Sequence, residues 1–114
     1  RMDYKQHTKD RFIEKFVPMI KSKQRKFWRE RTNKNWTELT DTDYSNLCEL
    51  CNTNPLHKQL DKVIVRYNNT YMWCVLTRKK KVVKTIYPIT KNHYNRFLKI
   101  YGYYYSVLTC TINK

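Results

Sequence analysis

Three residues near the N-terminus combine side chains that can act on a phosphodiester. His7, Arg11 and Lys15 are spaced four residues apart within the stretch YKQHTKDRFIEKF. On a helix, residues four apart are rotated by only about 40°, so the three would form one stripe on its outer face. Histidine moves protons near neutral pH, arginine grips a phosphate through two hydrogen bonds, and lysine stabilises charge on its oxygens. The stripe therefore suits RNA cleavage by the ribose 2′-hydroxyl group, although any amphipathic helix also has a polar face.

A second group of polar side chains lies in the segment VVKTIYPI. Side chains alternate between the two faces of a strand, so Thr85 and Tyr87 face one way and Lys84 the other. Their hydroxyl groups would lie side by side, with Arg66 or Arg78 on neighbouring strands. Tyrosine stacks on bases and hydrogen-bonds to phosphates. The alternative is that these β-branched and aromatic residues only fill a central strand.

The first half of the chain has the hydrophobic spacing of helices. A helical pattern covers residues 5–31, and Pro18 is expected to kink or break it because proline lacks a backbone N–H. Five apolar residues are expected on the arc that packs against the fold: Phe12, Ile13, Phe16, Val17 and Ile20. Thr40–Asp43 resemble a helix N-cap ahead of a second, shorter helix.

The second half changes to the pattern of strands. KVIVRY, TYMWCVLT and VVKTIYPI predict three strands, with a tight turn at Asn68–Asn69. We therefore expect a single α+β domain over residues 1–114, with the helices packed on one face of the sheet. Its parts are N-terminal helices (about 5–52), an antiparallel β-meander (about 62–89), and a late helix with a final strand (about 91–112).

The charge balance predicts a polyanionic partner. The chain has 24 Lys and Arg against nine Asp and Glu, a formal net charge of +15. Such a field favours nucleic acid first, and an anionic membrane surface or an acidic protein second. The basic turn of Arg78, Lys79, Lys80 and Lys81 is suited to contact a phosphate backbone. An A/T-rich genome would also enrich lysine, but acidic residues would then be expected to keep pace. No apolar run is long enough to predict a membrane span.

Four cysteines leave three interpretations open. Cys48 and Cys51 have CxxC spacing and could bind zinc together with Cys74, Cys110 or His57; they could form disulfides; or all could be free thiols. A second CxxC is absent, and Cys74 and Cys110 lie in apolar strand-like runs, which favours free thiols and a cytosolic site of action. We expect no metal and no cofactor.

The two polar segments together resemble a known superfamily. HTKDRFIEK on a helix and VVKTIYP on a late strand resemble motifs of the small metal-independent endoribonucleases that share the barnase, EndoU, colicin and RelE fold. These include toxin–antitoxin mRNA interferases, contact-dependent and colicin-type RNase toxins, and a phage endoribonuclease that clips early transcripts. The order of helix and then meander agrees with this superfamily.

The resemblance implies a role for each matching residue. His7 would be the acid or base, Arg11 and Lys15 would bind the phosphate, and Thr85 and Tyr87 would be the strand-borne pair. The further RNA contacts would come from Arg66, Arg78, Lys79, Lys80, Lys81 and Lys84.

These expectations describe a basic endoribonuclease of toxin or phage type that cleaves single-stranded RNA or tRNA without metal. It would act in the cytoplasm, delivered there in some cases as part of a larger toxin, and would have an acidic antitoxin or immunity protein as partner. The alternative is a non-catalytic nucleic-acid-binding or host-modulating protein. A zinc-stapled interaction module is the third interpretation.

Overall fold

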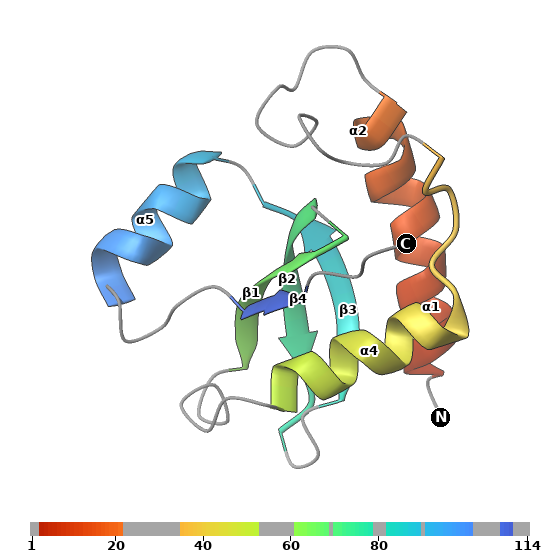
Figure 1. The fold of residues 1–114 in the computed structure, drawn as a ribbon. Coiled ribbons are helices and arrows are strands. Elements are labelled where there is room, and N and C mark those ends of the chain that lie inside the picture. The colour runs from red at the N-terminus through yellow and green to blue at the C-terminus, as the bar shows by residue number, and fades with distance from the viewer. Residues whose placement is uncertain are drawn as a thin grey trace.

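The structure, a computed structural model, describes residues 3–21, 35–52, 61–68, 70–78, 82–89, 91–101 and 108–110. N-terminal helices, three antiparallel strands and a later helix follow one another along the chain, so the expected α+β class is confirmed. Figure 1 shows the strands at the centre of the molecule, with helices on both sides.

The first helical stretch runs without a break from residue 4 to residue 21. It consists of α1 (Tyr4–Arg11), the π-helical segment η1 (Phe12–Phe16) and α2 (Val17–Lys21). The Asp3 carboxylate caps its start by accepting a hydrogen bond of 3.1 Å from the Gln6 N–H. Within the π segment, the Val17 N–H donates to the Phe12 carbonyl, five residues back. Pro18, which has no N–H to donate, follows at once, so the expected irregularity is a π turn rather than a break.

The helix α4 (Asp41–Asn52) begins at a reciprocal cap. The Asp43 N–H donates to the Thr40 hydroxyl oxygen at 3.1 Å, and the Thr40 N–H donates to the Asp43 carboxylate at 3.0 Å. The N-cap expected at Thr40–Asp43 is therefore confirmed. Tyr44 and Leu47 follow on the buried side of the helix, so α4 packs on the sheet.

In the described residues, the sheet contains four strands in the order β3-β2-β1-β4. Their bounds are β1 Lys62–Tyr67, β2 Thr70–Leu76, β3 Val83–Pro88 and β4 Leu108–Cys110. The first three form the expected antiparallel meander, and Asn68 has a φ of 50° in the turn between β1 and β2. Asparagine tolerates this left-handed conformation better than most residues. The final strand, β4, pairs with β1 in parallel.

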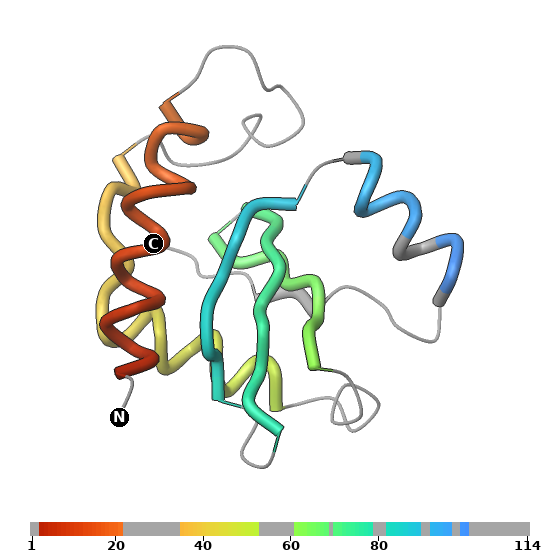
Figure 2. The backbone as a smooth tube through the Cα atoms, turned by 180° about the vertical axis from the view of Figure 1, so that it is seen from behind, coloured from red at the N-terminus to blue at the C-terminus, as the bar shows by residue number. Residues whose placement is uncertain are grey.

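The helix α5 (Lys91–Tyr101) lies on the other side of the sheet from α1 and α4 (Figures 1 and 2). Because β3 and β4 run in the same direction at opposite edges of the sheet, the chain between them must cross the sheet. The expectation that the helices share one face is therefore correct for α1 and α4 and wrong for α5.

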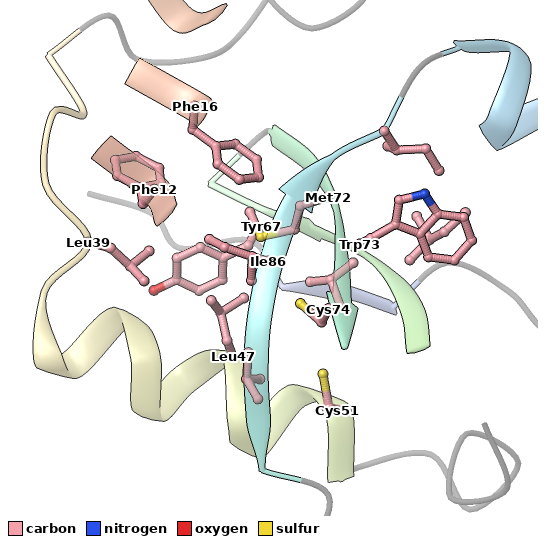
Figure 3. Close-up of a cluster of buried hydrophobic side chains, with 14 of the residues drawn as sticks. Phe12, Phe16, Leu39, Leu47, Cys51, Tyr67, Met72, Trp73, Cys74 and Ile86 are labelled. Carbon is pink, nitrogen blue, oxygen red and sulfur yellow. The ribbon is translucent and has the colours of Figure 1, made fainter. Parts of the chain in front are cut away.

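The hydrophobic core fills the space between the sheet and the N-terminal helices. The Phe12 ring lies 5.5 Å from Phe16 and 4.5 Å from Trp36, and Trp36 lies 5.9 Å from Tyr67 on β1. Figure 3 shows Tyr67 and Ile86 of the sheet pointing into this cluster, between the helices and β3. Four of the five apolar residues expected on the helix's packing arc are buried or half-buried: Phe12, Phe16, Val17 and Ile20.

Ile13 is the exception on that arc, since 53% of its surface is exposed. It lies inside the π segment, where each turn closes one residue later than in an α-helix. The regular helical spacing used for the expectation does not hold there.

Candidate functional site

The three N-terminal candidates lie on α1 and η1. His7 and Arg11 are half-buried on α1, and Lys15 is exposed on η1. Arg11 forms an ion pair of 3.0 Å with Glu14, so its guanidinium is not free to bind a phosphate without leaving this partner. Lys15 lies within the π segment and is out of phase with the stripe expected for an unbroken α-helix.

The opposite flank of α1 is tied to α4. Lys9 donates a hydrogen bond of 2.9 Å to the Asp41 carboxylate, and Lys5 lies 3.9 Å from it. The Asp41 carboxylate raises the pKa of Lys9, and Lys9 with Lys5 lowers the pKa of Asp41. Since residues two apart on a helix point to nearly opposite sides, His7 lies on the flank of α1 away from Asp41.

Thr85 and Tyr87 project from the other face of the sheet. Tyr87 is paired in register with Trp73, and Thr85 with Val75. Trp73 alternates along β2 with Met72 and Cys74, which point towards the helices, and Figure 3 shows Trp73 on the far side of β3. Strand β3 therefore lies between these two residues and the face that α1 covers.

The two halves of the sequence-derived site consequently do not face each other across one cleft. α1 packs mainly on β3, so both halves flank the same edge strand of the described sheet. His7 and Arg11 lie on the helix side of that strand, whereas Thr85 and Tyr87 lie on the opposite side, which we call the outer face. The residues of β1, β2 and β3 on the outer face are Lys62, Ile64, Arg66, Tyr71, Trp73, Val75, Thr85 and Tyr87.

A cation and two aromatic rings come together on the outer face. The Lys62 ammonium lies 4.6 Å from the centre of the Trp73 ring and donates a hydrogen bond of 3.4 Å to the Tyr87 hydroxyl. The Trp73 and Tyr87 rings are 6.4 Å apart. Trp73 is only 8% exposed, whereas Tyr87 is 36% exposed. We call Lys62, Trp73 and Tyr87 the Lys62 cluster; its outermost ring is Tyr87.

Lys62 was not among the residues singled out in the sequence. The alternation of KVIVRY and the tight turn at Asn68 would have placed it on the face of Trp73, because a short hairpin fixes the register of its strands. The signal was therefore present, but it required pairing the two strands residue by residue.

Arg66 also lies against an aromatic ring on the outer face. Its guanidinium lies 5.8 Å from the Tyr71 ring, and the Tyr71 ring is 5.1 Å from Tyr94 of α5. Burial and Tyr71 raise the pKa of Tyr94, and the charge of Arg66 opposes this. This part of the face is thus covered by α5, in contrast to the part around Tyr87.

Two more candidates lie at the end of the sheet where β2 turns into β3. Arg78 is exposed in the turn, which is closed by a hydrogen bond of 3.0 Å from the Thr77 N–H to the Val82 carbonyl. Lys84 is exposed and lies in a β-bulge of β3. Val75 of β2 pairs with Thr85 and the next residue, Leu76, pairs with Val83, so Lys84 has no partner on β2. The other members of the basic turn, Lys79, Lys80 and Lys81, lie outside the described residues.

The charge is distributed unevenly along the chain. Residues 62–114 contain 11 Lys and Arg and no Asp or Glu, so all nine acidic residues precede β1. The ion pairs of the described residues join basic side chains of α1 to Asp41 and Glu14, which both lie in the first half. Within the described ranges, none of Lys62, Arg78 and Lys84 forms an ion pair with a carboxylate.

The cysteines of α4 and β2 are free thiols in the core. Cys51 and Cys74 are fully buried, and Figure 3 shows their sulfur atoms between α4 and the sheet. The half-buried Cys48 sulfur accepts a hydrogen bond of 3.4 Å from the Val83 N–H. Burial raises the pKa of Cys48, and contact with Cys51 together with burial raises that of Cys74. The thiols of Cys48 and Cys74 are therefore protonated and poorly reactive.

Zinc gains no support from this arrangement. In the part of the chain that the structure describes, no group of three or more His, Cys, Asp or Glu side chains is placed to hold a metal ion. His57 and the side chain of Cys110 lie outside that part.

In comparisons with protein-family models, curated proteins and solved structures, nothing matches this chain. The resemblance to metal-independent endoribonucleases therefore rests on the two sequence motifs. Among the described helices, none is both long enough and apolar enough to cross a membrane.

Proposed function

We propose that this protein binds RNA through the outer face of the sheet beside β3. The observation that carries the proposal is the Lys62 cluster: a lysine held by the Trp73 ring and the Tyr87 hydroxyl, in a half of the chain that has no acidic residue. Single-stranded nucleic acids are bound by this combination of cations for the phosphates and aromatic rings for the bases. Arg78 and Lys84 extend the positive charge along the same end of the sheet.

The same surface is complementary to an acidic protein. An antitoxin or immunity protein rich in carboxylates would compete with RNA for Lys62, Arg78 and Lys84. A cytoplasmic site of action is part of this proposal, including delivery there within a larger toxin, and the free thiols of the described cysteines support it.

Metal-independent RNA cleavage is the second candidate. It is favoured by one arrangement: the flank of α1 that carries His7 and Arg11 and the Tyr87 side of β3 border the same edge strand. An RNA strand that crosses this edge would contact both. The 2′-oxygen would then attack the phosphorus, His7 would take its proton, and the bond to the 5′-oxygen would break as that oxygen takes a proton from water, giving a 2′,3′-cyclic phosphate. Arg11 would have to exchange Glu14 for the phosphate.

Binding is tested by fluorescence anisotropy with labelled single-stranded RNA over a range of salt concentrations. We expect the affinity to fall steeply with salt, and Lys62→Ala to weaken binding more than Lys5→Ala does. These substitutions remove the same charge, but Lys5 is an exposed lysine near Asp41 on the helix side. Equal effects of the two variants, or an affinity that does not depend on salt, would contradict the proposed surface.

Cleavage is tested by incubating RNA and tRNA with the protein in EDTA and mapping the ends. The second candidate predicts 2′,3′-cyclic phosphate ends that disappear in His7→Ala and Tyr87→Phe while both variants still bind. RNA that stays intact at a large excess of protein removes the cleavage candidate and leaves the binding proposal standing.

A further inference from the structure

We infer that Tyr87 is a stacking site for one unpaired RNA base and that Lys62 binds the phosphate next to it. This inference rests on the proposed RNA binding and deepens it, because it names the strandedness of the RNA and the residue that senses it. According to this inference, the Lys62 cluster binds single-stranded RNA selectively and is not only a general contact for polyanions.

The first reason is the exposure of Tyr87 and its support from below. More than a third of its surface is open, yet its ring contacts Trp73, which is almost buried, and its hydroxyl is held by Lys62. A tyrosine on a strand, fixed at both its ring and its hydroxyl, loses little conformational entropy when a base stacks on it. The exposed ring is therefore preorganised for a flat partner.

The second reason is the position of the cation. Lys62 lies within 3.4 Å of the Tyr87 hydroxyl, so its ammonium group is beside the place where a stacked nucleotide would carry its phosphate. Its charge is unpaired with any carboxylate of the described residues. Contact with the Trp73 ring removes part of its water without neutralising it, which leaves it available for an anion.

The third reason is that this face is open at Lys62 and Tyr87, whereas α5 contacts it at Tyr71. Lys62, Val75 and Thr85 form one row across the three strands, and Lys62 is exposed while Val75 and Thr85 are half-buried. The other cation and ring on this face, Arg66 and Tyr71, are contacted by Tyr94 of α5. A base can thus reach Tyr87, whereas α5 covers Tyr71.

Strandedness follows from the geometry of stacking. In a duplex, the faces of the bases are covered by their neighbours, so a tyrosine on a sheet surface gains nothing from them. Phosphates are available in both forms of RNA. The ring of Tyr87 should therefore matter for single strands alone, while Lys62 should matter for both.

The experiment measures anisotropy with a labelled oligoadenylate of about 12 nucleotides and with the matching RNA duplex. For the single strand, we expect Tyr87→Ala to weaken binding about tenfold and Tyr87→Phe to stay within about twofold of the wild type. For the duplex, Tyr87→Ala should stay within about twofold. Lys62→Ala should weaken both and lower the slope of log K against log salt by about 0.7 for the single strand.

The outcomes separate this inference from the function on which it rests. If Tyr87→Ala weakens the single strand and the duplex equally, or if Tyr87→Phe loses as much as Tyr87→Ala, base stacking is overturned while RNA binding stands. If the wild type binds neither RNA, the proposed function fails and the inference fails with it. Circular dichroism of each variant, together with Tyr87→Trp, which keeps a stacking ring, shows whether a loss reflects misfolding.

Discussion

On the helix side of the sheet, Lys9 and Arg11 are held by carboxylates; on the outer face, Lys62 and Arg66 lie against aromatic rings. Lys9 is bonded to Asp41 and Arg11 to Glu14, so the first half of the chain neutralises much of its own charge. Lys62 instead lies over Trp73 in a half that contains no acidic residue. The charge of the first face is used within the fold, whereas that of the second is left for an external anion.

The two faces also differ in what their side chains do for stability. The helix side buries a continuous apolar core around Phe12, Trp36 and Tyr67. Its exposed ion pairs add little, since solvent screens them. We therefore expect substitutions on the helix side to change stability and those on the outer face to change RNA affinity.

The largest effect is expected from Phe12→Ala. Phe12 is fully buried against Phe16 and Trp36, and truncating such a ring costs about 3–5 kcal/mol of unfolding free energy. Urea denaturation measures the loss. RNA affinity per folded molecule should stay unchanged. A fall in that affinity would contradict the assignment of stability to the helix side and of RNA binding to the outer face.

A smaller loss of about 1–2 kcal/mol is expected from Tyr67→Phe. The Tyr67 hydroxyl donates a hydrogen bond of 2.7 Å to the buried Asp43 carboxylate and accepts one of 3.2 Å from Asn46. Tyr4→Phe, which removes the hydroxyl of a half-buried tyrosine at the start of α1, is the matched control. Equal unfolding curves for wild type and Tyr67→Phe would show that the carboxylate does not need this donor.

The same carboxylate predicts a pH dependence. Burial raises the pKa of Asp43, but hydrogen bonds from Thr40 and Tyr67 outweigh it and lower the pKa below its usual value. A lowered folded pKa contributes stability that is present above the unfolded pKa of about 4 and is lost as the pH falls through the folded value. The difference between wild type and Tyr67→Phe should therefore shrink below about pH 4 in urea titrations. A difference that grows on acidification would reverse the assigned direction.

At the end of the sheet where β2 turns into β3, Arg78→Ala and Lys84→Ala should weaken RNA binding moderately and leave stability unchanged. Both side chains are exposed, so little packing is lost. Each phosphate contact removed should lower the salt slope for single-stranded RNA by about 0.7. An unchanged slope in both variants would restrict the RNA contact to the Lys62 cluster.

The smallest effect is expected from Asp41→Asn. It removes the carboxylate that holds Lys9, but the pair is exposed, and such pairs contribute little to folding. Thermal melts in low salt should show a slight loss that disappears in about 1 M salt. A large, salt-independent loss would mean that this pair fastens α1 to α4.

Local signals allowed most elements to be predicted from the sequence. The β1 segment KVIVRY has the expected bounds, the late helix begins at the expected residue 91, and Thr40 with Asp43 forms the expected cap. In each case the decisive information lies within a few residues, in strand alternation, helical spacing or capping chemistry.

What depends on distant contacts was not predictable in the same way. The side of the sheet on which α5 lies is not encoded in its own spacing, and neither is the parallel pairing of β4 with β1. In the candidate site, too, the part that depends on local signals was predictable and the part that depends on distant contacts was not. Strand alternation placed Thr85 and Tyr87 on one face correctly, but the position of His7 relative to that face depends on how α1 packs on β3.

The π turn at Phe12–Phe16 has a consequence for tracing the ancestry of this helix. Since its hydrogen bond spans five residues where an α-helix spans four, the chain holds one residue more than an uninterrupted helix of the same pitch. Consider a homologue with a plain α-helix here, aligned to this chain without a gap. If the residues before the turn are matched to those on the same face of the helix, the residues after it are matched to residues on a different face. The HxxxRxxxK spacing includes this extra residue. A spatial counterpart of Lys15 in such a homologue is therefore expected one position earlier.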